Sequence, residues 1–391
     1  GTKNYTAGLV GTANPGRFIE CYNTGKVAAN ESASNIAGLV AYATAESGSI
    51  DKYVFDQCYN TSDIISKTVA GGLVATSSES SSVYNPMSFN KCYNTGAVTT
   101  KGSAFSGAAT GGIIALYTAG SEFLDCYNTG NVTAEKSTYA AGIAGAYKWK
   151  TVADSVRVLL KRCYNTGDIA ANGNLGGGIV GSTPDYITVD SCYNVGNISG
   201  KFALGGIAAN LNSADAILSN CWNAGNVTTS MNRAAGIVGW NNKAAQIINC
   251  FNVGDITNTS KGYGTGGIAG QGGAIFTNCY NMGTLTGNNE VGGIVGETFK
   301  GLTQLIGCYN AGKIVAPADT CGGLIGLNIN QSRYWSDGNK VENSYYVTDF
   351  GTFENDKLGE ATTIAALAKA DLGKAWIAGD DYTLPILASI S

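Results

Sequence analysis

A seven-residue motif recurs along almost the whole chain, and its spacing decides what kind of fold the chain can adopt. The motif is Cys, an aromatic residue and Asn, followed in most copies by Gly two residues after the Asn, and by Val, Ile or Leu at its end. Successive copies lie 37, 34, 34, 37, then five times 29, and finally 36 residues apart. A regular period of this size indicates a repeat architecture. The ten copies begin at Cys21, Cys58, Cys92, Cys126, Cys163, Cys192, Cys221, Cys250, Cys279 and Cys308, and a degenerate copy begins at Ser344.

A second motif alternates with the first: two small residues, two apolar residues and a further small one. Its eleven copies begin at Ala7, Ala37, Gly71, Gly111, Ala141, Gly177, Gly205, Ala235, Gly266, Gly292 and Gly322. The segments are short and rich in Val, Ile and Thr, so they predict three short strands per repeat rather than helices. One such repeat cannot bury its apolar face alone. We therefore expect an all-β fold, a parallel β-solenoid (β-helix) of about eleven coils.

Strand alternation predicts which side chains of the Cys motif point inward. The residue three positions before each Cys is large and apolar, as at Phe89, and the residue directly before it is usually polar, as at Lys91. The cysteines should then form an internal column. We expect buried reduced thiols, because metal sites need converging ligands and disulfides between in-register coils would be strained; metal and disulfide remain as alternatives. The motif Asn should hydrogen-bond from coil to coil, and the motif Gly should supply a positive φ.

The aromatic residues of the motif should also form one column, and its role is open. One interpretation is a structural stack of rings. The other is a row of rings that binds a sugar chain or another partner. The candidate binding residues are Tyr127, Tyr164, Tyr193, Trp222 and Phe251.

The composition excludes several classes of function. The chain contains no His, which removes Ser-His and Cys-His nucleophile pairs and His-containing zinc sites. Its acidic residues do not line up from repeat to repeat. The net charge is −4 and the basic residues are scattered, so we expect no nucleic-acid partner. No apolar run is long enough to span a membrane. We expect no enzyme activity, no cofactor, no metal and no membrane insertion of this segment.

The composition changes after about residue 350, where the repeat stops. We expect two domains, a solenoid over 1–350 and a small α/β cap over 351–391 that protects the open end from edge-to-edge pairing and keeps the protein a monomer. Within the cap, a short helix should run from Thr363 to a terminating Gly373, followed by a strand near 382–387. The abrupt start beside a repeat indicates a piece of a longer chain. Longer inserts at 76–90 and 148–161 are candidates for individual binding functions.

The two motifs together resemble the GLUG-motif repeats of bacterial cell-surface proteins, which are named for a Gly-Leu-x-Gly core. Gly8-Leu9-Val10-Gly11 and Gly323-Leu324-Ile325-Gly326 match that core, and Asn278-Cys279-Tyr280-Asn281-Met282-Gly283 is similar to the part that follows it. The resemblance covers roughly residues 7–350. It implies a secreted or wall-attached protein of Gram-positive or gut bacteria. Relatives include regions beside the catalytic domain of streptococcal IgA-cleaving metallopeptidases, whose zinc motif needs the His that this chain lacks.

These observations favour a non-catalytic structural or adhesive region of a bacterial cell-surface protein, a rigid solenoid whose loops bind a host or matrix protein or a glycan. The alternative is a β-helix polysaccharide lyase or glycoside hydrolase, which would require clustered acids and bases on one face. A carbohydrate-binding module that uses the aromatic column is a third hypothesis.

Overall fold

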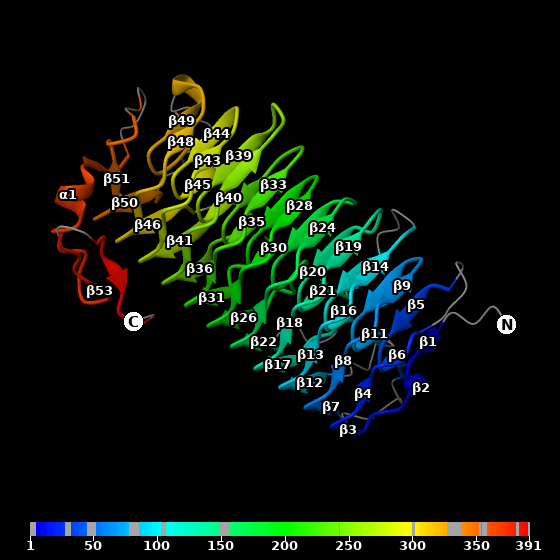
Figure 1. Cartoon of the computed structure of the whole chain (residues 1–391). Coiled ribbons are helices and arrows are strands. Elements are labelled where there is room, and N and C mark those ends of the chain that lie inside the picture. Colours follow the sequence, from blue (N-terminus) through cyan, green and yellow to red (C-terminus); the bar gives the residue numbers. More distant parts are fainter. Residues whose placement is uncertain are drawn as a thin grey trace. The chain divides into compact units, whose positions relative to one another are not determined.

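The fold is a stack of short parallel strands with almost no helix, which confirms the predicted all-β parallel β-solenoid (Figure 1). The computed structural model describes residues 5–27, 33–44, 52–77, 86–102, 107–148, 156–241, 243–298, 302–326, 338–351, 353, 358–380 and 383–389. The inserts at 78–85 and 149–155 thus lie outside the described residues. The chain divides into two compact units, residues 1–201 and 202–391.

Each coil of the first unit carries up to five short strands, and equivalent strands of successive coils form five parallel sheets, A to E in chain order. Sheet A consists of β1 (Tyr5–Ala7), β5 (Asn35–Ala37), β10 (Val69–Gly71), β15 (Ala109–Gly111), β20 (Tyr139–Ala141) and β25 (Leu175–Gly177). Sheet B consists of β2 (Val10–Ala13), β6 (Val40–Ala43), β11 (Val74–Ser77), β16 (Ile114–Tyr117) and β21 (Ala144–Tyr147). Sheet C consists of β3 (Arg17–Ile19), β7 (Tyr53–Asp56), β12 (Met87–Asn90), β17 (Glu122–Leu124), β22 (Val158–Lys161) and β26 (Ile187–Asp190). Sheet D consists of β4 (Tyr22–Asn23), β8 (Tyr59–Asn60), β13 (Tyr93–Asn94), β18 (Tyr127–Asn128), β23 (Tyr164–Asn165) and β27 (Tyr193–Asn194). Sheet E consists of β9 (Ile64–Ser66), β14 (Val98–Thr100), β19 (Val132–Ala134), β24 (Ile169–Ala171) and β28 (Ile198–Gly200).

The second unit repeats the same plan. Sheet A consists of β29 (Ala203–Gly205), β34 (Ala234–Ala235), β39 (Tyr263–Gly266), β44 (Asn289–Gly292) and β49 (Cys321–Gly322), which the 3₁₀ helix η1 (Ala318–Thr320) precedes. Sheet B consists of β30 (Ala208–Leu211), β35 (Val238–Asn241), β40 (Ala269–Gly272) and β45 (Val295–Thr298). Sheet C consists of β31 (Ile217–Ser219), β36 (Ala245–Ile248), β41 (Ala274–Thr277), β46 (Gln304–Ile306) and β50 (Lys340–Glu342). Sheet D consists of β32 (Trp222–Asn223), β37 (Phe251–Asn252), β42 (Tyr280–Asn281), β47 (Tyr309–Asn310), β51 (Tyr345–Val347) and β52 (Glu360–Thr362). Sheet E consists of β33 (Val227–Thr229), β38 (Ile256–Asn258), β43 (Leu285–Thr286) and β48 (Ile314–Val315).

The coil count and the strand count differ from the sequence-based expectation. Sheet E has five strands in the first unit and four in the second, so nine coils are complete among the described residues, rather than about eleven. The last repeat is incomplete because, after β51, the chain adds only β52 to the stack, in sheet D. Each coil has more than the three strands expected, because the Gly-rich motif is divided between sheets A and B. The aromatic-Asn pair also forms a strand of its own.

The register places each motif position on its counterpart in the next coil. Tyr59 pairs with Tyr93 in sheet D, and Phe55 pairs with Phe89 in sheet C. The large apolar residues before each Cys therefore stack inside the coils, as predicted. The rings of Phe55 and Phe89 lie 4.8 Å apart and are fully buried. Burial of each such ring contributes about 2–3 kcal/mol to folding.

The C-terminal segment contains the one α-helix of the described residues, α1 (Ile364–Leu367), and a strand pair. The Thr363 hydroxyl caps the helix by accepting a hydrogen bond from the amide of Ala366 at 3.2 Å, as its position as N-cap predicts. The helix ends at Leu367, well before Gly373, because the next amides bond three residues back. Strands β53 (Trp376–Ile377) and β54 (Ile386–Leu387) then pair antiparallel.

Candidate functional site

Each corner of the Cys motif begins with a residue in the left-handed region directly before the Cys. In the first unit these residues have φ between 50° and 55° and are Glu20, Gln57, Lys91, Asp125, Arg162 and Ser191. This conformation turns the chain so that the Cys points inward and the side chain before it points outward. In the second unit the position holds Asn220, Asn249, Asn278, Gly307 and Asn343, which are the residue types that tolerate a positive φ best.

The choice of residues at this position differs between the units in an informative way. A residue with a Cβ pays about 1–2 kcal/mol for the left-handed region, and Asn or Asp relieves part of this cost by local hydrogen bonds. The first unit nevertheless places Glu20, Gln57, Lys91 and Arg162 there. Because these four residues keep long polar side chains in a strained backbone conformation, we infer that the side chains have a role at the protein surface.

The motif Gly plays a different role from the one predicted, because it does not have a positive φ. A Cβ at Gly130 would overlap the carbonyl oxygen of Gly96 in the preceding coil, and a Cβ at Gly167 would overlap that of Gly130. The Gly is therefore required by the close approach of successive coils.

The cysteines form the predicted internal column of free thiols. All are buried except Cys21 in the first repeat, and none of the eleven cysteines forms a disulfide. The Cys92 thiol donates to the carbonyl oxygen of Phe55 in the preceding coil at 3.3 Å, and Cys163 bonds in the same way to Phe123 at 3.4 Å. Burial raises the pKa of the Cys279 thiol well above its usual range. The buried thiols therefore pack inside the corner, where solvent does not reach them.

The motif asparagines form the predicted ladder inside the corner. The Asn94 side chain donates to the Asn128 amide oxygen at 2.8 Å, and Asn128 donates to Asn165 at 2.8 Å. The Asn128 amide nitrogen also donates to the carbonyl oxygen of Gly130 at 2.7 Å. Every member of the ladder therefore serves its own corner and the next coil.

The aromatic column of the first unit is open to solvent along one side. Neighbouring rings lie 4.8–5.0 Å apart and within 6° of parallel, so the rings of Tyr59, Tyr93, Tyr127 and Tyr164 cover one another's faces. Tyr22 at the start of the column is 57% exposed, and the later rings are half-buried. The column therefore presents ring edges and hydroxyl groups to solvent rather than ring faces.

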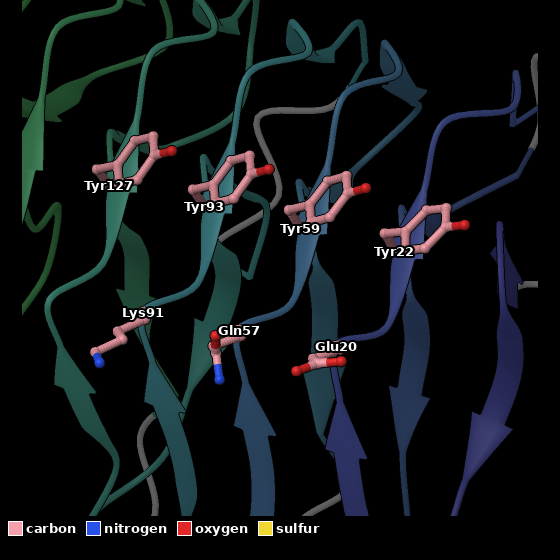
Figure 2. Close-up of a pocket in the computed structure, with 7 residues that line it drawn as sticks. All are labelled: Glu20, Tyr22, Gln57, Tyr59, Lys91, Tyr93 and Tyr127. Carbon is pink, nitrogen blue, oxygen red and sulfur yellow. The ribbon is translucent and has the colours of Figure 1, made fainter.

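An open groove of about 480 Å³ runs along this column. Figure 2 shows two parallel rows, one of rings with their hydroxyls on the same side and one of polar side chains from the left-handed positions. The groove is lined by Tyr22, Tyr59, Tyr93, Tyr127, Glu20, Gln57 and Lys91. The strained side chains and the ring edges thus face the same groove.

Charges of both signs continue the polar row. The Arg162 guanidinium makes two hydrogen bonds to the Asp125 carboxylate, at 2.6 and 2.8 Å. The hydrogen bonds from Arg162, together with the positive charges of Arg162 and Lys91, outweigh desolvation and hold the pKa of Asp125 below its usual value. The row therefore contains acidic, neutral and basic groups along the coils, from Glu20 to Ser191.

The C-terminal segment covers the aromatic column in the second unit. A single apolar cluster joins four buried residues of the segment to the rings, namely Leu367, Leu372, Trp376 and Leu387 packed with Tyr280 and Tyr309. The Trp376 ring centre lies 5.7 Å from Tyr280 and 5.3 Å from Tyr309. The Tyr309 hydroxyl donates to the carbonyl oxygen of Pro385 at 2.7 Å. As a result Tyr280 and Tyr309 are only 4% and 0% exposed, and burial raises the pKa of Tyr280 to about 12.

Gly307 lies beside the C-terminal segment. Among the described left-handed positions before a motif Cys it is the one that has no side chain. A Cβ there would lie 2.9 Å from the Asn278 amide oxygen and 3.9 Å, an ordinary contact distance, from the carbonyl oxygen of Leu372.

The five predicted binding residues fall into two environments. Tyr127, Tyr164 and Tyr193 stack in the open column of the first unit, with ring centres 4.9 and 5.0 Å apart. Trp222 and Phe251 stack in the second unit, 5.9 Å apart, and Phe251 also packs against the C-terminal cluster. The groove itself is lined by Tyr127 together with three earlier rings, Tyr22, Tyr59 and Tyr93. Sequence reasoning missed the polar row beside them, although polar residues before each Cys are visible in the sequence.

In the part of the chain that the structure describes, no three His, Cys, Asp or Glu side chains converge as a metal site requires. Within the same residues, no helix has the length and apolar character needed to cross a membrane.

Comparison with known proteins identifies no family for this chain. No protein-family model matches the sequence, and no protein with a curated description matches it. The chain is similar to a provisionally assigned immunoglobulin A1 protease from Bacteroides ovatus of known crystal structure, with 14% identity over 96% of this chain and 92% of that one. The TM-score is 0.33. At this level the likeness supports no conclusion about activity.

Proposed function

We propose that this chain is a non-catalytic, adhesive β-solenoid region of a bacterial cell-surface protein, and that the open aromatic groove of its first unit binds an extended polypeptide. The secreted or wall-attached location and the relationship to GLUG-motif repeats belong to the same proposal. They are supported by the Gly-Leu-x-Gly copies at Gly8 and Gly323.

The observation that carries the proposal is the contact between the second unit's aromatic column and the protein's own C-terminal segment. That contact shows what kind of chemistry covers such a column: aliphatic and Trp side chains pack on the rings, and a Tyr hydroxyl donates to a backbone carbonyl. The first unit presents the same column without this cover. The first unit also has the polar row beside this column. The charges of the row would select among partners and fix the position at which a partner binds along the groove.

The ring geometry favours a polypeptide over a glycan. Sugars bind aromatic side chains through ring faces, where the negative end of the ring quadrupole meets polarised C–H groups. In the first unit these faces are occupied by neighbouring rings at 4.8–5.0 Å. Ring edges and hydroxyls remain, and these suit apolar side chains and backbone carbonyls.

A binding survey with matched variants tests the proposal. The 391-residue chain would be applied to immobilised collagen, fibronectin and laminin, and separately to a glycan array. We expect binding to a polypeptide, with the dissociation constant raised about tenfold or more in a Tyr59→Ala/Tyr93→Ala double variant. Ile65→Ala is the control, because Ile65 is a 49% exposed residue of the same coil, on β9 of sheet E.

The proposed partner class is wrong if only glycans bind, or if the double variant binds its partner as tightly as the Ile65 control does. A Lys91→Glu variant adds a second check on the polar row. It should weaken binding more at low salt than at high salt, because exposed charges are screened.

A further inference from the structure

The contact between sheets A and B differs in chemistry between the two units. In the first unit one buried apolar cluster at this contact includes Val69, Ala109 and Leu116, and other coils have the small polar residues Thr76 and Ser182 at the position of Leu116. Val69 and Ala109 stand two residues before the Gly-rich motif, and Leu116 stands five residues after the motif begins. In the second unit the same two positions hold Arg233 before the motif and Trp240, Gln271 and Glu297 after it.

Arg233 connects these positions. Its guanidinium lies 4.9, 5.2 and 5.0 Å from the ring centres of Phe202, Trp240 and Tyr263. It also lies 3.7 Å from the Glu297 carboxylate, which is too long for a strong hydrogen bond. Both charged residues are more than nine-tenths buried, with Arg233 8% and Glu297 7% exposed.

Several polar atoms of this cluster have no hydrogen-bond partner. They are Arg233 Nε, both side-chain amide atoms of Gln271, and Glu297 Oε2. Gln271 is completely buried, and sheet register places it between Trp240 and Glu297. Both of these residues lie beside the Arg233 guanidinium. Its amide is therefore directed into the Arg233 cluster. Unpartnered buried polar groups are rare in folded proteins, because each costs about 1–3 kcal/mol.

Stability does not explain these residues. Some coils of the first unit form the same sheets with the apolar Val69, Ala109 and Leu116 at these positions, and apolar replacements for buried ion pairs are often neutral or stabilising. The rings of Phe202, Trp240 and Tyr263 are half-exposed, so the cluster reaches solvent on their side.

We propose that the Arg233, Gln271 and Glu297 side chains, with the Trp240 and Tyr263 rings, form a binding site for a neutral sugar residue of a glycan. The atoms of the cluster that lack a hydrogen-bond partner include both N–H donors and oxygen acceptors. A sugar hydroxyl can pair with either, because it can donate a hydrogen bond and also accept one. The Arg233 guanidinium also donates to the Tyr263 hydroxyl at 3.5 Å.

The charges of the site favour a neutral ligand. Glu297 and the neighbouring Glu290 oppose an anionic sugar, and Arg233 opposes a cation. Burial raises the pKa of Glu297 to about 7. The negative charge of Glu290 also raises this pKa, whereas the positive charge of Arg233 lowers it. Its carboxyl can thus accept from or donate to a hydroxyl near neutral pH.

Calorimetric titration of the 391-residue chain with cellohexaose, chitohexaose, mannohexaose and xylohexaose tests the site, with a galacturonate hexamer as the charged comparison. We expect one neutral hexaose to bind, the charged hexamer to bind more weakly, and Gln271→Leu to raise the dissociation constant about tenfold or more. The matched control is Gln246→Leu, on the exposed face of β36 in the same unit, which should leave binding unchanged.

If Gln271→Leu does not fold, Glu297→Gln and Trp240→Phe keep the shape of the site and should show the same loss. The proposal fails if no neutral hexaose binds, if the charged hexamer binds more tightly, or if the variants bind as the wild type does. None of these residues lines the aromatic groove of the first unit, so a failure here leaves the proposed polypeptide binding standing, and the reverse also holds.

Discussion

Gly112→Ala is expected to prevent folding or to lower the free energy of unfolding by at least about 4 kcal/mol, because the added methyl group has no room. A Cβ at this position would overlap the carbonyl oxygen of Gly142 in the next coil and lie 2.7 Å from the Asn128 amide oxygen. Both atoms are fixed, one by the backbone and the other by the asparagine ladder. Relief would require separating two coils that share five sheets. Chemical denaturation followed by circular dichroism measures the change.

Gly11→Ala is the matched control, because it changes another Gly of the same motif. Its Cβ would come no closer than 3.7 Å to the carbonyl oxygen of Tyr5, which is ordinary van der Waals contact. We expect a change below about 1 kcal/mol in either direction. Equal effects of the two substitutions would show that the close approach of coils does not govern this motif.

Asn128→Asp is expected to destabilise the protein by about 3–5 kcal/mol at neutral pH, because it places an unpaired charge inside the ladder. Asn128 accepts from Asn94 and donates both to Asn165 and to the carbonyl of Gly130. A carboxylate can only accept, so it would face two oxygens without a proton. Burial should raise the pKa of the new carboxyl above its unfolded value. Stability should then be greatest below the unfolded pKa and fall as the pH rises through the folded one.

The control for this substitution is Asn249→Asp. Asn249 belongs to the outer row of left-handed residues, where it is half-exposed and donates to Asn220 at 3.2 Å. Asp tolerates the same backbone conformation. Thermal unfolding at several pH values should show a small, nearly pH-independent change for Asn249→Asp. A small change for Asn128→Asp as well would contradict a ladder that needs both donor and acceptor.

Most of the fold can be predicted from the sequence because the same two motifs recur along the chain. Period and alternation together predict that Phe89 and Cys92 point inward, that Asn94 meets Asn128, and that Tyr93 stacks on Tyr127. Each of these contacts repeats from coil to coil within a unit, so one correct inference about a coil applies to its neighbours. The number of complete coils was less predictable, since the last repeats merge with a segment of different sequence.

The features that matter for binding were harder to infer, for physical reasons. Alternation gives the side on which a residue lies but not its φ, and Glu20 or Lys91 carries no sign of a left-handed backbone. Only the Asn residues of the second unit hint at it. The position of the C-terminal segment depends on contacts such as Trp376 with Tyr309, far apart in sequence. The Arg233 cluster depends on how sheets A and B face one another, which no single strand pattern reveals.

The contrast between an open aromatic column and a covered one is most directly tested by hydroxyl-radical footprinting of the 391-residue chain, read residue by residue with mass spectrometry. In the free protein, Tyr22, Tyr59 and Tyr93 should be modified far faster than Tyr280 and Tyr309, which are 4% and 0% exposed. Adding the polypeptide that binds should protect the first three rings and leave the other two unchanged. Equal rates in the free protein, or a bound partner that leaves Tyr59 and Tyr93 as reactive as before, would contradict a docking surface on the open column.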